Sequence, residues 1–257
     1  MRCCWLALAG LLMGTALHAQ QPPQAGQNPP AAQPAAQLDT LLQRWEQEMK
    51  RIETLSAELN RTTVDKVFQG TEVFSGAAKY MKPNLAVLEM KRKDKPEIFE
   101  KYICSGTFLY EWVPGSKVIR AHELPPPKEG QVGDDNFLSF LFGMKAEEAK
   151  KRYDLKLMKE DQFYYYVQVL PKLAADKADF QEARLALNKS SFLPREVRFT
   201  QPNGNEIIWD IPKIETGVKV PREDFAPPQT LPQGWNLVRV PRADAAQQQP
   251  RVVRPQQ

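Results

Sequence analysis

The chain has 257 residues, of which 42% are hydrophobic and 26% are charged, and its formal net charge at pH 7 is +4. This composition is typical of a globular protein. Its 12 Phe, 7 Tyr and 5 Trp exclude a chain that is disordered throughout, and a total of only 13 Gly excludes a collagen-like repeat. The length allows one large domain or two small ones.

Residues 1–19 have the pattern of a secretory signal peptide. They start with Arg2, continue as an apolar run and end in small residues around Ala16 and Ala19. The run is shorter than the roughly 20 residues of a membrane span. We therefore expect cleavage after Ala19 and export to the periplasm or the medium. In the other interpretation the segment stays in place as an anchor.

Low-complexity segments flank the part that can fold. Residues 20–37 contain only Gln, Pro, Ala, Gly and Asn. Residues 242–257 are rich in Gln and Pro and carry three Arg against one Asp. Neither segment can form an apolar core, so we predict a disordered linker and a disordered basic tail around one domain at residues 38–241. A weak contact of the tail with an anionic surface is the alternative.

Charge and rare residue types restrict the partners of this domain. Arg2 contributes one and the tail two of the four net positive charges, which leaves +1 for the domain. Nucleic-acid binding needs clustered basic residues, so we expect no nucleic-acid partner. Outside the signal peptide only Cys104 and His122 remain, which excludes an internal disulfide and a two-histidine metal site. We expect a buried thiol, a surface imidazole, and neither metal nor cofactor.

The domain begins with an amphipathic pattern. Apolar residues recur with the spacing of one stripe on an α-helix: Leu38, Leu41, Leu42, Trp45, Met49, Ile52 and Leu55. The stripe predicts a first helix that packs on a sheet of its own domain, since most amphipathic helices serve their own core. Contact with a partner protein is the alternative.

From about residue 57 the apolar period changes to two. Strands are predicted at 57–68, 71–81, 85–93, 97–104, 107–113 and 117–124, and later at 164–171 and 180–188. The short links between them favour an antiparallel meander over parallel βαβ units. A final hairpin is predicted with the loop Asn203–Asn205, which pairs Phe199 with Trp209, Val197 with Ile211 and Arg198 with Asp210. The fold class is therefore α+β.

A second helix is predicted at Asp134–Tyr153, between the two groups of strands. Its first half is apolar around most of its circumference and its second half is charged. It either plugs one end of a curved sheet or forms a lid that an apolar ligand displaces. The apolar residues are Phe137, Leu138, Phe140, Leu141, Phe142 and Met144.

The sequence shows no catalytic motif. It lacks the nucleophile elbow, the phosphate-binding loop, the dinucleotide-binding glycine pattern, and the zinc-protease helix. The acidic pairs Asp134–Asp135 and Glu147–Glu148 are adjacent on helices and therefore diverge by about 100°. The run Tyr164–Tyr166 alternates across a strand and favours packing over sugar binding. We assign no catalytic residue and expect no enzyme.

Two short motifs in this order resemble a known family. The early meander carries Lys79-Tyr80-Met81-Lys82-Pro83-Asn84-Leu85 and then Ser105-Gly106-Thr107-Phe108-Leu109-Tyr110. With the first helix, the mid-chain apolar helix, Asn203-Gly204 and the closing Asp224–Pro228, the chain is similar to LolA, the periplasmic carrier of outer-membrane lipoproteins, over most of residues 38–240. It looks like an exported branch of that family rather than the carrier itself.

The resemblance implies a fold and a function. The fold is a strongly curved, antiparallel, incomplete β-barrel with an N-terminal helix and a mid-chain helical lid. Its apolar cavity holds lipid or lipoprotein acyl chains, as in transport to the outer membrane. The ligand-binding residues would be the six apolar lid residues together with Trp112, Phe199 and Trp209. Lys82 stands where the carriers have an arginine that latches the lid, and lysine lacks the planar guanidinium fork.

A second function is compatible with the same fold. The chain would then be an envelope sensor or protein-contact module without enzymatic activity, with envelope membrane proteins as partners. An apolar cavity favours the carrier, whereas a core closed by bulky Trp and Tyr with an exposed apolar patch favours the contact module. In both cases we expect a monomer.

The lid hypothesis predicts the effect of one substitution. Leu141→Asp places a charge in the apolar run and should alter lipid uptake, with little loss of the β-sheet signal in circular dichroism. Unchanged lipid binding by this variant would exclude the lid.

Overall fold

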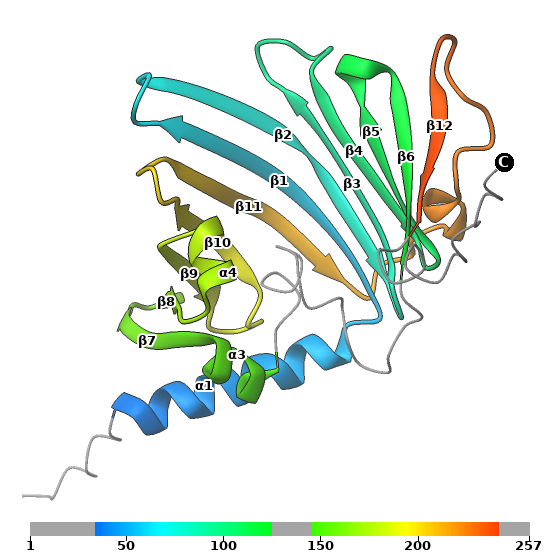
Figure 1. The fold of residues 1–257 in the computed structure, drawn as a ribbon. Coiled ribbons are helices and arrows are strands. Elements are labelled where there is room, and N and C mark those ends of the chain that lie inside the picture. Colours follow the sequence, from blue (N-terminus) through cyan, green and yellow to red (C-terminus); the bar gives the residue numbers. More distant parts are fainter. Residues whose placement is uncertain (1–33, 125–144, 242–257) are drawn as a thin grey trace, which may run out of the picture. The chain divides into compact units, whose positions relative to one another are not determined.

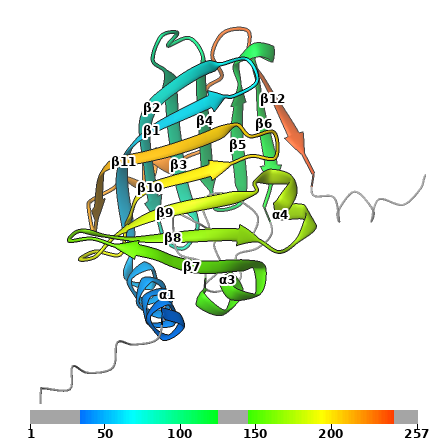
Figure 2. The same ribbon diagram turned by 90° about the vertical axis from the view of Figure 1, so that its left-hand side faces the viewer.

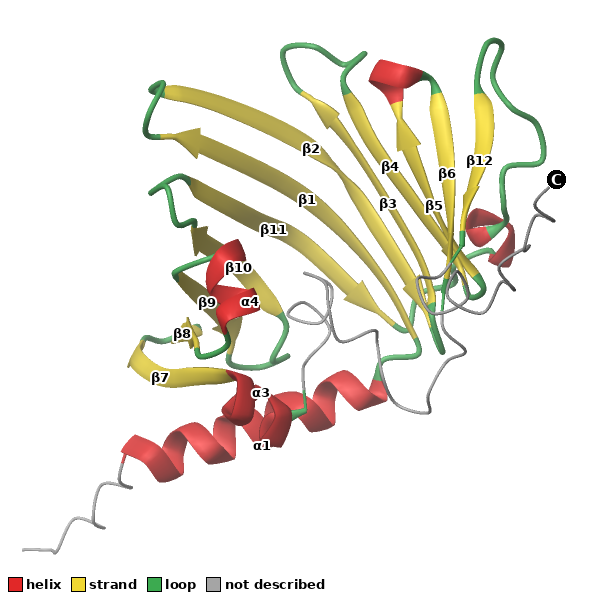
Figure 3. Cartoon of the chain, in the orientation of Figure 1, coloured by secondary structure: helices red, strands yellow, loops and turns green. Residues whose placement is uncertain are grey.

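The computed structural model of the protein describes residues 34–124 and 145–241 (Figure 1). In this part of the chain the fold is α+β, with one sheet and few helices (Figure 3). The helices are α1 (Pro34–Arg51), α3 (Ala146–Arg152) and α4 (Ala174–Asp179), and the 3₁₀ turns are η1 (Pro114–Ser116) and η2 (Arg222–Phe225). The strands are β1 (Thr54–Asp65), β2 (Gly70–Met81), β3 (Leu85–Arg92), β4 (Phe99–Ser105), β5 (Phe108–Val113), β6 (Val118–Glu123), β7 (Tyr153–Glu160), β8 (Tyr164–Pro171), β9 (Glu182–Asn188), β10 (Pro194–Thr200), β11 (Glu206–Thr216) and β12 (Asn236–Val240).

The 12 strands form a single sheet in the order β12-β6-β5-β4-β3-β2-β1-β11-β10-β9-β8-β7. Neighbours are antiparallel except β12 and β6, which are parallel. The predicted meander is thus confirmed. The strands with predicted ranges lie close to them, whereas β7 and β12 were not predicted. The predicted strong curvature is corrected, because the sheet is open, with β12 and β7 at its edges (Figures 1 and 2).

The first helix packs on one face of the sheet, as its stripe predicts. Four side chains of α1, and Ile52 directly after the helix, are at most 7% exposed and belong to the same apolar cluster as residues of β1, β2 and β7–β11. The four are Leu41, Leu42, Trp45 and Met49. We call this face of the sheet the core face. Burying each of these side chains contributes about 1.5–3 kcal/mol. The helix begins at Pro34, ahead of its predicted start at Leu38.

The apolar side of the sheet changes along its width. In β4–β6 the buried cluster of Ile103, Tyr110, Ile119 and Ala121 lies on the opposite face, which we call the outer face. Trp235, from the segment before β12, packs on this second cluster. The buried cluster of β4–β6 is therefore covered from the outer face and does not require these strands to curl over α1.

The final hairpin forms on the predicted face but in another register. Val197 pairs with Trp209 and Phe199 with Ile207, so the predicted pairs Phe199–Trp209 and Val197–Ile211 are wrong by two residues. The Asn205 carbonyl accepts from the Gln201 backbone, and the Asn205 side chain accepts from the Lys66 N–H at 2.9 Å. These bonds keep Asn205 in the ladder, so the turn is centred one residue earlier than predicted.

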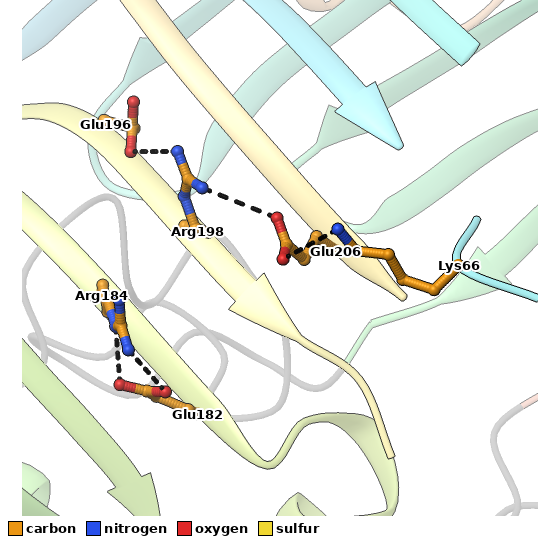
Figure 4. A network of polar contacts seen from close by, with 6 residues as sticks. All are labelled: Lys66, Glu182, Arg184, Glu196, Arg198 and Glu206. Carbon is orange, nitrogen blue, oxygen red and sulfur yellow. Dashed lines mark hydrogen bonds and ion pairs between the residues drawn. The ribbon is translucent and has the colours of Figure 1, made fainter. Parts of the chain in front are cut away.

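Alternating charges cover the outer face of β9–β11 (Figure 4). Glu182 binds Arg184 at 2.7 Å, and Arg198 lies between Glu196 at 3.4 Å and Glu206 at 3.6 Å. The predicted pair of Arg198 with Asp210 does not form, because the register shift places Ile208 opposite Arg198. This charge-balanced face is typical of a sheet surface in water.

One glycine in the middle of the sheet admits no side chain. A Cβ atom added at Gly76 would lie 1.8 Å from the carbonyl oxygen of Glu89, whereas one at Gly70 would have no atom within 4 Å. We expect Gly76→Ala to lower the free energy of unfolding by about 3 kcal/mol or more. Gly70→Ala, in the same strand, should change it little. Equal urea midpoints for the two variants would contradict this close approach of β2 and β3.

Candidate functional site

The predicted ligand-binding residues do not share one surface. Phe199 and Trp209 lie on the core face, where Trp209 is 7% exposed within the main cluster. Trp112 lies on the outer face, because it pairs with Lys101, the neighbour of the core-face residue Tyr102. The six apolar lid residues, Phe137, Leu138, Phe140, Leu141, Phe142 and Met144, lie outside the described residues, so the lid stays a prediction.

Lys82 contacts the end of the first helix. Its ammonium group donates to the carbonyl oxygen of Lys50, in the last turn of α1, at 2.5 Å and lies 2.8 Å from the carboxylate of Glu53. The carbonyls of a last helical turn have no partner within the helix and attract cations. Lys82 therefore fixes the C-terminal end of α1 to the end of β2. Its role as a lid latch stays a prediction.

A carboxylate of α1 also holds α3. Glu46 accepts a hydrogen bond from the backbone N–H of Ala146, the first residue of α3, at 2.9 Å. The hydrogen bond from Lys50, and next the one from Ala146, hold the pKa of Glu46 below its usual value of 4.5. In a second contact between the helices, Lys150 of α3 forms an ion pair with Asp39 of α1 at 2.8 Å. The two helices thus form one unit beside the edge strand β7 (Figure 2).

The lowered pKa of Glu46 predicts an acid-sensitive contact between the helices. Because its carboxylate is favoured in the folded state, the stabilisation is complete above about pH 4.5 and is lost as the pH falls through the lower, folded-state pKa. Glu46→Gln should remove this part of the acid dependence, measured as unfolding free energy against pH. Glu123→Gln, at an exposed strand end, serves as the control and should leave the profile unchanged.

An ion pair crosses the core face between β1 and β4. The guanidinium of Arg61 binds both carboxylate oxygens of Glu100, at 2.6 and 2.7 Å. It lies over the rings of Phe74 and Trp209, at 4.5 and 5.4 Å from their centroids. The side chain of Arg61 is 17% exposed, and its Nε is buried without a hydrogen-bond partner. The bidentate geometry makes this pair strong, and losing one partner alone would leave the other charge uncompensated.

Beyond the ion pair, the core face carries a half-buried apolar row. We call it the β3–β5 row, and its members follow from the register of these strands: Ala86, Leu88, Tyr102, Cys104 and Leu109. No residue of β4–β6 belongs to the main cluster under α1. Burial raises the pKa of the Cys104 thiol, which donates to the carbonyl oxygen of Asn84 at 2.9 Å. The thiol is thus half-buried and hydrogen-bonded, whereas the sequence predicted a buried one.

Polar groups border the β3–β5 row toward β6. Glu111 pairs with Arg120 at 3.6 Å, and its carboxylate lies 3.0 Å from the Nε2 of His122. All three side chains are on the core face, because Glu111 pairs with Tyr102 and His122 with Leu109. The face is therefore amphipathic, with apolar residues in β3–β5 and balanced charges at its border.

Within residues 34–124 and 145–241, no group of three His, Cys, Asp or Glu is placed to hold a metal ion. In the same residues, no helix is long and apolar enough to cross a membrane.

The comparisons with known proteins show similarity of fold. No family model matches the sequence, and no curated protein matches it. The chain is structurally similar to LolA-superfamily proteins at low sequence identity. A LolA superfamily protein from Nitrosomonas europaea is 10% identical with a TM-score of 0.36, over 73% of this chain and 96% of that one.

Two further structures are similar to this chain. An uncharacterized conserved protein from Thermus thermophilus is 9% identical with a TM-score of 0.49, over 79% of this chain and 99% of that one. The Pseudomonas aeruginosa MucA/MucB complex is 10% identical with a TM-score of 0.44, over 75% of this chain and 62% of the matched chain.

Proposed function

We propose that the protein is an exported, non-enzymatic binding protein of the cell envelope. It shelters lipid or lipoprotein acyl chains on the core face of its sheet. The observation that carries the proposal is the β3–β5 row, an apolar continuation of the core face in which Leu88 alone packs against the main cluster. An acyl chain needs only apolar surface, and each Å² removed from water contributes about 25 cal/mol. The resemblance of the sequence to the LolA family supports the same function.

The border of the row fits an amphipathic ligand. An acyl chain that lies on Leu88 and Leu109 leaves its polar end toward β6, where Glu111, Arg120 and His122 are partly exposed. Opposite charges that already pair with each other leave little net field, so they tolerate a neutral or zwitterionic head better than they attract an ion. In this proposal the six apolar lid residues cover the site when it is empty and are displaced by the ligand.

The contact module remains the second candidate, and the edge strand β12 favours it. Leu237 and Val238 are 44% and 46% exposed, and the strand carries Arg239 as its only charged residue. Edge strands of this kind accept an additional strand from another chain. On this candidate the core face is closed by its own side chains, and the partner is an envelope protein.

Native mass spectrometry with lipid extraction separates the two functions. Residues 20–257, purified from a bacterial periplasm, should carry a lipid or an acylated peptide at close to one per chain. A clean mass without lipid, together with refusal of added lipid, would contradict the carrier and favour the contact module.

A substitution in the row tests its place in binding. Leu109→Asp puts a charge on the half-buried core face and should lower lipid occupancy at least about tenfold, because a carboxylate is costly to bury against an acyl chain. Leu170→Asp, on the outer face of β8 at 39% exposure, is the matched control and should keep its lipid. Equal occupancy in the two variants would exclude the β3–β5 row as the site.

A further inference from the structure

The β1–β2 hairpin presents two apolar side chains at its end. Phe68 is 85% exposed and Val67 is 64% exposed, which makes them the most exposed large apolar residues of the described chain. The strands β1 and β2 have 12 residues each and are the longest of the sheet. Figure 1 shows their connection at the end of the sheet remote from α1. We call Val67 and Phe68 the apolar tip.

The backbone of the apolar tip is fixed. The Asp65 carboxylate accepts hydrogen bonds from the N–H groups of both Val67 and Phe68, each at 2.9 Å. The next residue, Gln69, has φ of 53°, and the N–H of Lys66 donates to the side chain of Asn205. The two apolar side chains are therefore held outward by a closed turn and by the neighbouring hairpin.

The structure points to a lipid surface as the partner of the apolar tip. We infer that Val67 and Phe68 insert into the interfacial region of a membrane and bring the protein to the bilayer. This inference rests on the proposed function, since a protein that takes up and delivers acyl chains has to meet the membranes that hold them.

The area of the tip decides between a bilayer and a protein partner. Its two exposed side chains offer on the order of 300 Å², whereas a stable protein interface buries about 800 Å² on each partner. The tip also protrudes, so a protein partner would need a matching pocket. A bilayer needs no shape complementarity and accepts apolar groups to a depth of about 5–10 Å. Weak, reversible insertion is what a shuttle requires.

The polar groups of the turn are compatible with insertion. The two N–H groups beside the apolar side chains already have an acceptor in Asp65, so they lose no hydrogen bond on leaving water. Asp65 and Lys66 carry opposite charges. Lys66 lies 3.4 Å from Glu206, which in turn lies 3.6 Å from Arg198. These two acidic and two basic groups balance, so the predicted insertion is apolar rather than electrostatic.

Co-sedimentation with vesicles tests the inference. The mature chain, residues 20–257, is mixed with vesicles of phosphatidylethanolamine and phosphatidylglycerol, and binding is measured at low and high salt. The double variant V67S/F68S should lower the partition coefficient at least about tenfold, and wild-type binding should change little with salt. The matched control is F163S/L173S, which removes a Phe at 58% and a Leu at 52% exposure elsewhere on the molecule.

Three results would overturn the tip as a membrane contact. They are unchanged vesicle binding by V67S/F68S, equal loss in the control, and a loss that follows a change in self-association of the protein alone, seen by sedimentation without vesicles. Native mass spectrometry of the same preparations tests the proposed function separately. A tip-dependent association with vesicles in a protein that holds no lipid would confirm the membrane contact and exclude the carrier.

Discussion

The structure depends on how one wide sheet buries its apolar residues with few helices to cover it. A sheet has two faces, and the apolar cluster of α1 and α3 involves residues of β1–β3 and β7–β11 on one of them. The chain meets this constraint by changing the apolar side at β3. There Met90, on the core face, is fully buried, and Leu85, on the outer face, packs with Phe225 of η2. The N-terminal helix α1 thus covers one half of the sheet, and the C-terminal segment with Phe225 and Trp235 packs on the other half.

The change of side explains the character of the candidate site. The strands β4–β6 place their main apolar cluster on the outer face, so their core face can carry both apolar and polar side chains. The β3–β5 row is accordingly half-buried, and polar residues border it. A sheet that was apolar on one face throughout would close completely on its helices. The candidate ligand surface is therefore a consequence of the packing of the C-terminal segment, on the other side of the same strands.

The period of apolar residues predicted most helices and strands well, because burial of one face of a helix or strand determines the spacing of its apolar residues. The stripe of α1 and the range of β8 are examples. The spacing does not indicate which residues of different strands share one face of the sheet. Trp112 and Trp209 were predicted on one ligand surface, yet the register across β1–β5 places them on opposite faces.

Other features depend on contacts that are distant in the sequence. The hairpin register is set by the side chain of Asn205, which binds the backbone of Lys66 in another hairpin. The ion pair of Arg61 and Glu100 could not be predicted from the sequence, since the two residues are on strands that are not neighbours in the sheet. β12 was missed because four of its five residues are exposed and its burial shows no alternation. Its parallel pairing with β6 makes it a strand.

The Arg61–Glu100 pair sets a limit to any apolar ligand on this face. Along β4, Glu100 is the core-face residue next to Tyr102, so the pair stands at one end of the β3–β5 row. This pair is half-buried, and removing one partner would leave the other charge without compensation on an apolar face. An acyl chain offers no group to replace either partner, so it has to stop at the pair. The rings of Phe74 and Trp209, over which the guanidinium lies, belong to the main cluster that also contains the apolar side chains of α1. The ion pair therefore stands where this cluster borders the candidate ligand surface.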